Sequence, residues 1–347
     1  MPDESSIILE IEEIERSLGL DWRFSHHALS VGRDGDVKVA LSRQEVYDAL
    51  LEGSDAVERT GEGSSLLDLK GTRIAVELLR PPKGMAIWIT SSVADIRKSP
   101  DHASELLNQM IMGESADPLK LEADWYLVRL PDGYIGWLRS WHARETPRDE
   151  ISSFMAKADT RVEASVAYVR SSPGEEGLPV SDIVAGSRVV AEPARAGYRA
   201  VTLPGGRGGF MRESELGRGG GAPTREEVVG RAMGYLGIPY LWGGTSPKGF
   251  DCSGLVKRVF GMEGIELPRD TDRQALAGEE ASVDGAEPGD LLFFGEGGTV
   301  SHVAIGLGED RFIHAYGEVR INGLRRDDPL YEPKLSQSVR FARRILP

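Results

Sequence analysis

The stretch from Pro239 to Gly254 contains the only cysteine of the chain and residues suited to nucleophilic chemistry. A glycine-rich loop leads to Asp251-Cys252-Ser253-Gly254, and the apolar residues that follow recur at helical spacing. Cys252 is therefore expected at a helix N-terminus, where free backbone N–H groups and the helix dipole stabilise a thiolate and lower its pKa. Because the thiolate is the attacking form of cysteine, this context favours a nucleophile over an apolar filler.

Two histidines lie downstream, on apolar runs typical of two paired strands. His302 begins the first run, a turn follows at 308–310, and His314 lies on the returning run. With a three-residue turn, Ala304 is opposite His314 and the two imidazoles share a face as diagonal neighbours, whereas a two-residue turn puts them on opposite faces. The shared face predicts a triad in which Cys252 attacks, His302 takes the proton and His314 fixes the tautomer. The alternative is two polar residues on a half-exposed sheet.

The elements that position this chemistry form the last of several domains. Stretches rich in Pro and Gly at 81–84 and 218–223 are typical of linkers. Just after the second linker, Thr224 and Glu227 form a capping box that begins a helix. A chain of 347 residues has room for two to four domains. We therefore expect a mixed α/β N-terminal segment of unknown role at 1–83 and a catalytic domain at 222–347.

An internal repeat occupies the middle of the chain. Residues 93–100 match 166–173, and residues 133–139 match 206–212, both at an offset of 73 residues. One offset in two separate blocks indicates two copies of a single module. Short β-rich runs broken by Gly and Pro predict a small β-barrel for each copy. The two modules are expected at 84–148 and 149–218.

Composition and charge narrow the classes of partner. The formal net charge is −14, which argues against nucleic acid or an anionic membrane surface as the main partner. No apolar run approaches the ~18 residues of a membrane span. A single cysteine cannot form an intramolecular disulfide or a cysteine zinc site, and His302 and His314 are better explained by the triad. Because no convincing phosphate-binding loop occurs either, no metal or other cofactor is expected. The acidic N-terminus does not resemble a secretory signal, which leads us to expect a cytoplasmic protein.

Six stretches, in order over about 120 residues, resemble the NlpC/P60 family of cell-wall peptidases. They are Pro239-Tyr240-x-Trp242-Gly243-Gly244, Phe250-Asp251-Cys252-Ser253-Gly254, Leu267-Pro268-Arg269, Pro288-Gly289-Asp290-Leu291-x-Phe293-Phe294, Ser301-His302-Val303-Ala304-Ile305 and Ile313-His314-Ala315. The resemblance implies a papain-like α+β catalytic domain and a cysteine peptidase using Cys252, His302 and His314. It places the Cys252 backbone N–H at the oxyanion and leaves the second donor open. The two repeats resemble bacterial SH3 domains.

The whole layout resembles γ-D-glutamyl-L-diamino acid endopeptidases, which cut murein tri- or tetrapeptides that have a free N-terminal L-Ala. This resemblance implies that Glu105 and Tyr134, in the first repeat, lie near the substrate amine, with Glu114 as a rival acid. At the offset of 73 their counterparts in the second repeat are Leu178 and Arg207, so that copy lacks both groups. On the catalytic side, the residues expected to line the cleft are Tyr240, Asp251, Ser253 and Thr271.

Three other functions remain open at this stage. The protein could be a non-catalytic murein-peptide-binding protein, a secreted lysin of intact wall, or an acyltransferase on the same fold. The complete Cys/His/His set argues against the first, the acidic charge against the second, and the SH3-like modules against the third. The sequence leaves open whether the third substrate residue is meso-diaminopimelate or L-lysine. It also leaves open the oligomeric state.

Overall fold

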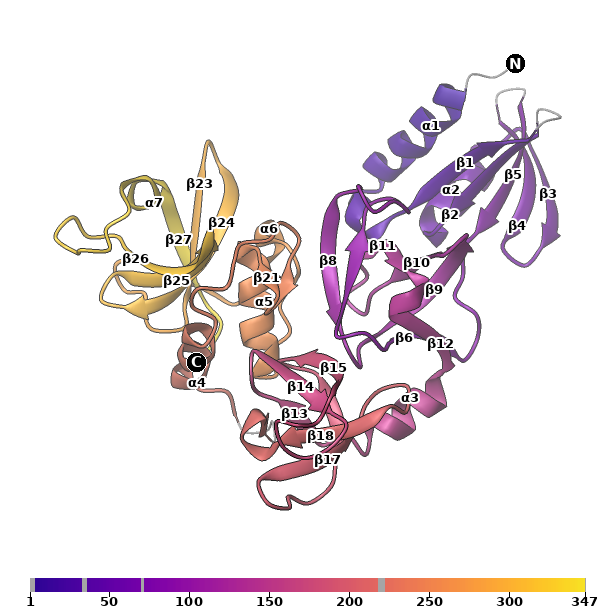
Figure 1. Cartoon of the computed structure of the whole chain (residues 1–347). Coiled ribbons are helices and arrows are strands. Elements are labelled where there is room, and N and C mark those ends of the chain that lie inside the picture. Colours follow the sequence, from indigo (N-terminus) through magenta and orange to yellow (C-terminus); the bar gives the residue numbers. More distant parts are fainter. Residues whose placement is uncertain (1–3, 33–35, 70–71, 218–221, 347) are drawn as a thin grey trace. The chain divides into compact units, whose positions relative to one another are not determined.

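The structure, a computed structural model, describes residues 4–32, 36–69, 72–217 and 222–346 (Figure 1). The chain divides into two compact units, Met1–Ile87 with Ser115–Leu138 and Trp88–Glu114 with Arg139–Pro347. Most of the linker expected at 218–223 lies outside the described residues. Among the helices of the described ranges, none is long and apolar enough to cross a membrane.

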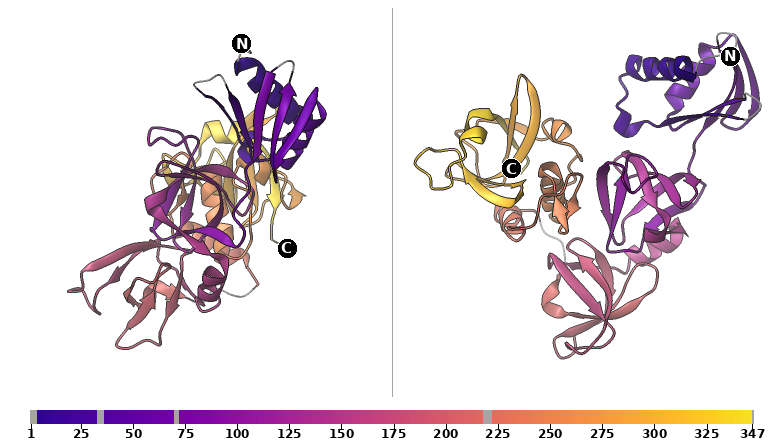
Figure 2. Two further views of the ribbon diagram at one scale, coloured as in Figure 1. Left: turned by 90° about the vertical axis from the view of Figure 1, so that its right-hand side faces the viewer. Right: turned by 45° about the horizontal axis from the view of Figure 1, so that its top comes forward.

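The N-terminal segment is a five-stranded sheet of order β1-β2-β5-β4-β3 with two helices packed on it (Figure 2). Neighbouring strands are antiparallel except β2 and β5. Ile7 and Ile11 of the first helix are buried against the sheet because they recur at helical spacing on one face. The elements are α1 (Glu4–Ser17), η1 (Trp22–Phe24), β1 (His27–Val31), β2 (Val37–Leu41), α2 (Gln44–Glu52), β3 (Ala56–Gly61), β4 (Ser64–Leu69) and β5 (Thr72–Leu78).

This segment packs on the part of the first repeat that belongs to the same unit. Arg129 Nη2 donates a hydrogen bond to the Ser42 carbonyl oxygen at 2.6 Å. The rings of His26 and Trp137 meet edge-on with centroids 6.0 Å apart. Within this unit, residues 1–83 therefore serve as a packing partner for the strands of residues 115–138.

The strands of the two repeats keep the offset found in the sequence. β7 begins at Val93 and β14 at Val166, 73 residues later, and the same shift relates β8 to β15, β10 to β17 and β11 to β18. The first copy comprises β6 (Met85–Ile89), β7 (Val93–Arg97), β8 (Leu106–Ile111), β9 (Ser115–Glu122), β10 (Trp125–Arg129), β11 (Ile135–Arg139), η2 (Ser140–His142) and β12 (Ala143–Pro147). The second comprises β13 (Thr160–Val162), β14 (Val166–Arg170), β15 (Pro179–Val184), β16 (Arg188–Ala191), β17 (Tyr198–Thr202), β18 (Gly208–Arg212), η3 (Glu213–Glu215) and β19 (Leu216–Gly217), and α3 (Arg148–Met155) joins the copies.

Strand pairing repeats as well. Val93 is opposite Ile111 in the β7–β8 pair, and Val166 is opposite Val184 in the β14–β15 pair. The two seven-stranded sheets have the same order under this correspondence, β12-β6-β9-β10-β11-β7-β8 and β19-β13-β16-β17-β18-β14-β15. The chain therefore contains two copies of one fold. Closure of each copy into a barrel stays a prediction.

The last part of the chain is a six-stranded sheet of order β22-β27-β23-β24-β25-β26 with α5 packed on β24 and β25 (Figure 1). The run Leu291–Phe294 is almost fully buried because both faces of its strand are covered. The elements are α4 (Arg225–Met233), β20 (Thr245–Ser246), β21 (Gly249–Phe250), α5 (Cys252–Met262), α6 (Thr271–Gln274), β22 (Glu279–Ala281), β23 (Leu291–Glu296), β24 (Thr299–Gly308), β25 (Arg311–Tyr316), β26 (Glu318–Gly323), α7 (Pro333–Ser338) and β27 (Val339–Arg344).

A buried amide on β8 fastens the first repeat to this last domain. Gln109 Oε1 accepts hydrogen bonds from Thr245 N at 3.2 Å and from Ser246 Oγ at 2.8 Å. Its Nε2 donates to Asp95 Oδ1 at 3.0 Å. Because Gln109 is 7% exposed, these bonds form in a dry environment where an unpaired polar group is costly. β8 is thereby held against the loop that leads to Cys252.

We expect Gln109→Leu to lower the free energy of unfolding by about 2–4 kcal/mol, because it leaves the amide of Thr245 and the hydroxyl of Ser246 buried without an acceptor. Asp182 is the counterpart in the second repeat and makes a half-exposed ion pair with Lys248. Asp182→Asn should therefore cost under about 1 kcal/mol. Urea unfolding measures both values, and equal losses in the two variants would contradict the role given to Gln109.

Candidate active site

Cys252 is the first residue of α5, and Asp251 caps that helix. The Asp251 Oδ1 atom accepts the Gly254 backbone N–H at 2.7 Å, as an N-cap residue does. This cap lets the glycine-rich loop pass into the helix with the thiol at its first turn. The Cys252 side chain is buried, with 9% of the residue exposed.

The carboxylate of Asp251 is the centre of a buried polar cluster. It forms an ion pair with Arg269, which is 4% exposed. Arg269 Nη1 also donates to Ser253 Oγ at 2.9 Å, and Gly243 N donates to Asp251 Oδ2 at 3.0 Å. Asp251 and Ser253, expected to line the cleft, are thus engaged in holding the nucleophile's loop. Arg269 belongs to the Leu267-Pro268-Arg269 stretch, but no role was predicted for it from sequence.

Two glycines let backbones approach closely at this loop. A Cβ on Gly254 would lie 2.0 Å from the Gly244 carbonyl oxygen, so only glycine fits there. Gly243 has φ +77°, and a Cβ on it would lie 2.2 Å from the Leu106 carbonyl oxygen. The second contact brings the loop against the start of β8.

The two histidines lie on adjacent strands and are joined by a hydrogen bond. Ile305 of β24 is opposite Ile313 of β25, and His302 Nε2 is 2.7 Å from His314 Nδ1. The two imidazoles therefore share a face, as expected. The turn itself has two residues, because Gly308 pairs with Arg311, and a bulge between Gly306 and Gly308 keeps Ile305 opposite Ile313. On the far side, His314 Nε2 is 3.0 Å from Oδ1 of Asn322, a residue of β26 that the sequence analysis did not single out.

The hydrogen bonds fix the tautomer of each ring, starting from a backbone carbonyl. Asn322 Nδ2 donates to the Leu330 carbonyl oxygen at 3.0 Å, so Asn322 Oδ1 is the acceptor that faces His314. His314 must then have its proton on Nε2 and a lone pair on Nδ1. His302 in turn donates from Nε2, which leaves the lone pair of its Nδ1 as the basic site. This assignment follows from the acceptor at the end of the chain of bonds.

Aromatic rings bury the histidine pair. Phe294 lies 5.6 Å from His302, Phe312 lies 5.1 Å from His314, and Tyr316 stacks on His314 at 6.1 Å between centroids. Burial, followed by the charge of His314, lowers the pKa of His302 to about 3. Burial is also the main cause that lowers the pKa of His314 to about 4. Both imidazoles are therefore neutral at neutral pH, as a general base must be before it takes a proton.

The pKa of Cys252 differs from the sequence expectation. Burial, and then the charge of Asp251, raise the pKa of the thiol. Hydrogen bonds from Thr271 and from the backbone of Val303 and Ser253 act in the opposite direction but do not reverse the shift. The helix start does act to lower this pKa, but the expected net lowering was wrong, because burial and the neighbouring carboxylate outweigh the backbone donors. The resting site therefore pairs a neutral thiol with a neutral imidazole.

Two further residues expected in the cleft lie beside the thiol. Thr271 Oγ1 is 3.7 Å from Cys252 Sγ. Burial, and then the charges of Cys252 and Asp251, raise the pKa of Tyr240 to about 12. Its phenol therefore keeps its proton at neutral pH and can donate a hydrogen bond near the nucleophile.

Glu105 lies at the mouth of this loop, next to Trp242. The indole Nε1 of Trp242 donates to Glu105 Oε1 at 3.0 Å, and Lys98 Nζ is 3.5 Å from Oε2. The carboxylate is 40% exposed, so it is partly open to solvent and already paired. The rival acid Glu114 accepts the Ile111 backbone N–H at 3.0 Å and is held in that turn.

Tyr134 lies in the other compact unit from Cys252. It is 3% exposed, and its ring meets Phe24 edge-on with centroids 5.7 Å apart. The position is set by packing with the N-terminal segment. Contact of Tyr134 with a substrate amine stays a prediction.

Two residues of the site could have been sought from the sequence. Asn322 lies eight residues after His314, across the tight turn around Gly317 that joins β25 to β26, so a polar residue on the next strand was the signal. Trp242 directly precedes the glycine pair in the loop that leads to Cys252, and this position was its signal; in the structure it is 63% exposed. Within the described ranges, no group of three or more His, Cys, Asp or Glu residues is placed to hold a metal ion.

Two family models match parts of the chain. Residues 237–340 match the NlpC/P60 family, and residues 96–142 match the bacterial dipeptidyl-peptidase SH3 domain. The second match covers the first repeat alone. The first match includes Cys252, His302 and His314.

Two curated relatives and one solved structure each match about 70% or more of this chain. A gamma-D-glutamyl-L-lysine dipeptidyl-peptidase of Bacillus subtilis is 28% identical over 255 residues, covering 69% of this chain and 81% of the relative. Dipeptidyl-peptidase 6 of Lysinibacillus sphaericus is 28% identical over 268 residues, covering 72% and 96%. The crystal structure of an NlpC/P60 family protein from Bacillus cereus superposes with a TM-score of 0.64 at 24% identity, covering 76% of this chain and 100% of that one, which shows a shared fold.

We expect Asn322→Leu to lower kcat about 10- to 100-fold with a smaller change in KM. Without Oδ1, His314 is free to place its proton on Nδ1, which turns His302 to the tautomer that cannot take the thiol proton. Asn322→Asp keeps an acceptor and should retain more activity than Asn322→Leu. Steady-state kinetics on one peptide tests this order, and equal activity of Asn322→Leu and the parent would contradict the tautomer assignment.

Proposed function

Since residues 237–340 are an NlpC/P60 domain and residues 96–142 a bacterial dipeptidyl-peptidase SH3 domain, we propose that this peptidase is a cysteine endopeptidase of murein peptides. It hydrolyses the bond between γ-D-Glu and the diamino acid in peptides with a free N-terminal L-Ala. The hydrogen-bonded His302–His314 pair on the strands facing the Cys252 helix is the observation that carries the proposal. The name of the Bacillus subtilis relative supports the choice of bond.

In the first step the thiol gives up its proton as it attacks. His302 Nδ1 accepts the proton of Cys252, and the sulfur adds to the γ-carbonyl carbon of D-Glu. The new imidazolium still donates from Nε2 to His314, so the lone pair of His314 stabilises the positive charge. A neutral resting pair suits this concerted transfer, because no thiolate has to persist in a buried site.

A backbone N–H and a phenol donate hydrogen bonds to the oxyanion that forms on the substrate carbonyl oxygen. The Cys252 N–H is one of the orphan donors at the start of α5. We assign the second donor to Tyr240, whose phenol stays protonated because burial raises its pKa. Collapse of the intermediate breaks the C–N bond, and His302 returns the proton to the leaving amine. Water, deprotonated by His302, then hydrolyses the thioester.

The carboxylate of Glu105, beside Trp242, recognises the N-terminal amine of the substrate. An ammonium on L-Ala pairs with Glu105, while the indole of Trp242 holds that carboxylate in place. Lys98 occupies the same carboxylate at 3.5 Å and is displaced by the substrate amine. A glycan-linked peptide lacks this amine, so it leaves Glu105 with only its internal partners and gains nothing there.

Selection of the free amine supports a role after the peptide has left the glycan. We propose that the enzyme acts on released peptides in the cytoplasm, as in recycling of wall material. A secreted lysin, the alternative, acts on intact wall and does not need a free L-Ala amine. Activity on free peptide and inactivity on purified sacculi would favour recycling.

The activity itself is tested with L-Ala-γ-D-Glu-L-Lys and L-Ala-γ-D-Glu-meso-diaminopimelate, each with a free or an acetylated N-terminus. Mass spectrometry should detect L-Ala-D-Glu only from the free-amine forms. Cys252→Ala should abolish release while leaving the protein folded, because a small side chain is replaced by a smaller one. No cleavage of any peptide by the parent protein would favour the binding-protein alternative.

Glu105→Gln should raise KM for free-amine peptides about 10- to 100-fold, because it removes a charge-assisted pair with the ammonium. kcat should change little, since Glu105 does not touch the reacting carbonyl. Glu122, in an exposed ion pair with Lys120, offers the matched control, and Glu122→Gln should leave KM unchanged. A similar rise in KM for both variants would point to general electrostatics and against amine recognition.

The pH profile of kcat/KM follows from the neutral base. The pKa of His302 is lowered to about 3, so the base stays unprotonated as pH falls through 6.5, and the acid limb should lie below about pH 5. Above about pH 8 the L-Ala amine loses its proton, and kcat/KM should fall. An acid limb near pH 6.5 would show that His302 titrates as an ordinary histidine and would contradict the buried site.

A further inference from the structure

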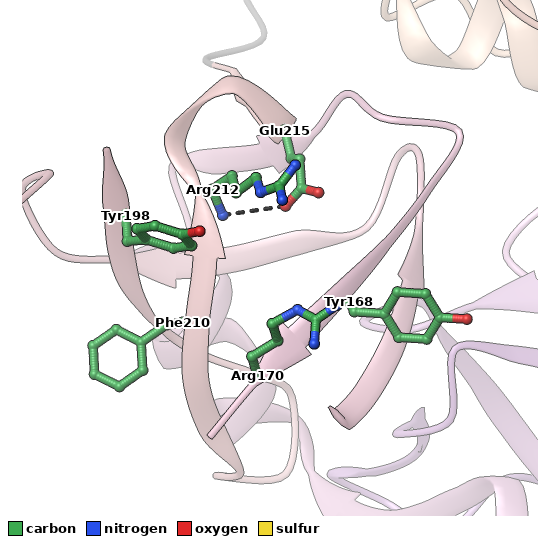
Figure 3. A pocket seen from close by; sticks show the side chains of 6 residues that line it. All are labelled: Tyr168, Arg170, Tyr198, Phe210, Arg212 and Glu215. Carbon is green, nitrogen blue, oxygen red and sulfur yellow. Dashed lines mark hydrogen bonds between the residues drawn. The ribbon is translucent and has the colours of Figure 1, made fainter. Parts of the chain in front are cut away.

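The second repeat has a pocket that the proposed reaction does not use. It is a small cavity of about 110 Å³, on the face formed by β14, β17 and β18 together with η3. Figure 3 shows Arg170 between Phe210 and Tyr168, and Arg212 beside Glu215. The side chains that line it are Tyr168, Arg170, Tyr198, Phe210, Arg212 and Glu215.

The two copies of the repeat differ at this face in one informative position. In the first copy, Asp95 forms an ion pair with Arg97 at 2.8 Å. At the offset of 73, Asp95 becomes Tyr168 and Arg97 becomes Arg170. On this strand the second copy therefore has an aromatic ring where the first copy has a carboxylate. The guanidinium is present in both copies.

Arg170 keeps the structural contact of its counterpart. Arg97 Nη1 donates to the Ser104 carbonyl oxygen at 2.7 Å, and Arg170 Nη1 donates to the Gly177 carbonyl oxygen at 2.9 Å. This bond closes the loop between the paired strands in both copies. It leaves the other edge of the Arg170 guanidinium facing the pocket.

A carboxylate from that loop lies on both arginines. Glu175 is ion-paired with Arg212 and lies 3.8 Å from Arg170. Its side chain is 64% exposed, so the pair is weak and open to exchange. The loop has glycine on either side, at Gly174 with φ +98° and at Gly177. The other acid, Glu215, accepts the Arg212 backbone N–H at 3.1 Å and closes the η3 turn.

The rings around the arginines remain partly open to solvent. Tyr168 is 49% exposed, and Leu178 at the end of the loop is 74% exposed. In the first copy the counterparts of Tyr198 and Phe210 are Trp125 and Trp137, which are buried by the N-terminal segment: both pack with Leu79, and the ring of Trp137 meets His26. The second copy therefore presents two guanidiniums among aromatic rings on a face that its twin uses for docking.

We propose that this pocket binds the carboxylate of a short peptide, which replaces Glu175 on Arg170 and Arg212. A guanidinium pairs with a carboxylate in a fixed, two-bond geometry, and the rings of Tyr168 and Phe210 cover the adjacent carbon atoms. The volume has room for a carboxylate and a few carbons, but a sugar or a nucleotide is too large. The site lies in the second repeat and does not depend on the proposed cleavage.

Binding is measured with the full chain as Cys252→Ala, by NMR shifts of the backbone amides of Tyr168, Arg170 and Arg212. The probe is N-acetyl-L-Ala-γ-D-Glu-L-Lys, and its fully amidated form, which has no carboxylate, is the matched control ligand. We expect saturable shifts at these amides with the probe and none with the amidated form. Equal shifts with both ligands would overturn the proposal.

Two variants should change the affinity of the pocket for the probe in opposite directions. Glu175→Gln removes the internal competitor and should tighten binding several-fold, whereas Arg212→Gln should weaken it about 10-fold. Arg73, in an exposed pair with Glu58 in the N-terminal unit, gives the control Arg73→Gln, which should bind as the parent does. Urea unfolding establishes that each variant is folded. Unchanged affinity in a folded Glu175→Gln would reduce the pocket to an internal ion-pair network and overturn the proposal.

A second experiment distinguishes two sources of the carboxylate, wall-bound peptide and released peptide. Co-sedimentation of the same proteins with purified sacculi, with free probe as competitor, distinguishes wall-bound peptide from released peptide. Retention on sacculi that Arg212→Gln abolishes would assign the pocket to the polymer. NMR binding without such retention would assign it to released peptides.

Discussion

A one-way chain of hydrogen bonds, from His302 through His314 and Asn322 to the Leu330 carbonyl, is the interaction on which the proposed chemistry depends. A carbonyl oxygen can only accept a hydrogen bond, so Asn322 must donate to it. This fixes which atom of His314 and of His302 is the donor. The lone pair of His302 is left on Nδ1, on the opposite side from the chain. Burial keeps both imidazoles neutral, so the base is ready before substrate arrives. The same burial raises the pKa of the Cys252 thiol, and in the proposed reaction the proton is therefore transferred during attack.

The rest of the structure holds the loop that presents the nucleophile. Asp251 caps α5 and pairs with Arg269, which fixes the first turn of the helix from inside. From outside, Gln109 of the first repeat bonds to the same loop beyond the glycine pair. This attachment explains how one module contributes both stability and Glu105, next to Trp242. The second copy has the same strand order with different residues at the equivalent positions, and the proposed carboxylate pocket lies on its face.

Much of this could be predicted from local sequence. Helical spacing after Cys252, alternating runs around His302 and His314, and the constant offset of 73 residues all depend on neighbouring residues, and the structure has the corresponding elements. Asn322 and the role of Arg269 were missed because their partners come from other elements, which periodicity does not reveal. The direction of the Cys252 pKa was wrong for the same reason: burial by distant side chains outweighs the local helix start. The limits of the second SH3-like domain, and contact of Tyr134 with substrate, stay predictions.

Nitrogen-15 NMR of the histidine side chains reports which ring nitrogen of each imidazole holds a proton, and so it tests the tautomer assignment. At pH 7 we expect His302 to be neutral, with its proton on Nε2 and none on Nδ1, and His314 likewise to have its proton on Nε2. Asn322→Leu should turn both rings toward the other tautomer. A His302 with both nitrogens protonated, or with its proton on Nδ1 in the parent protein, would show that this imidazole is not the base that accepts the thiol proton.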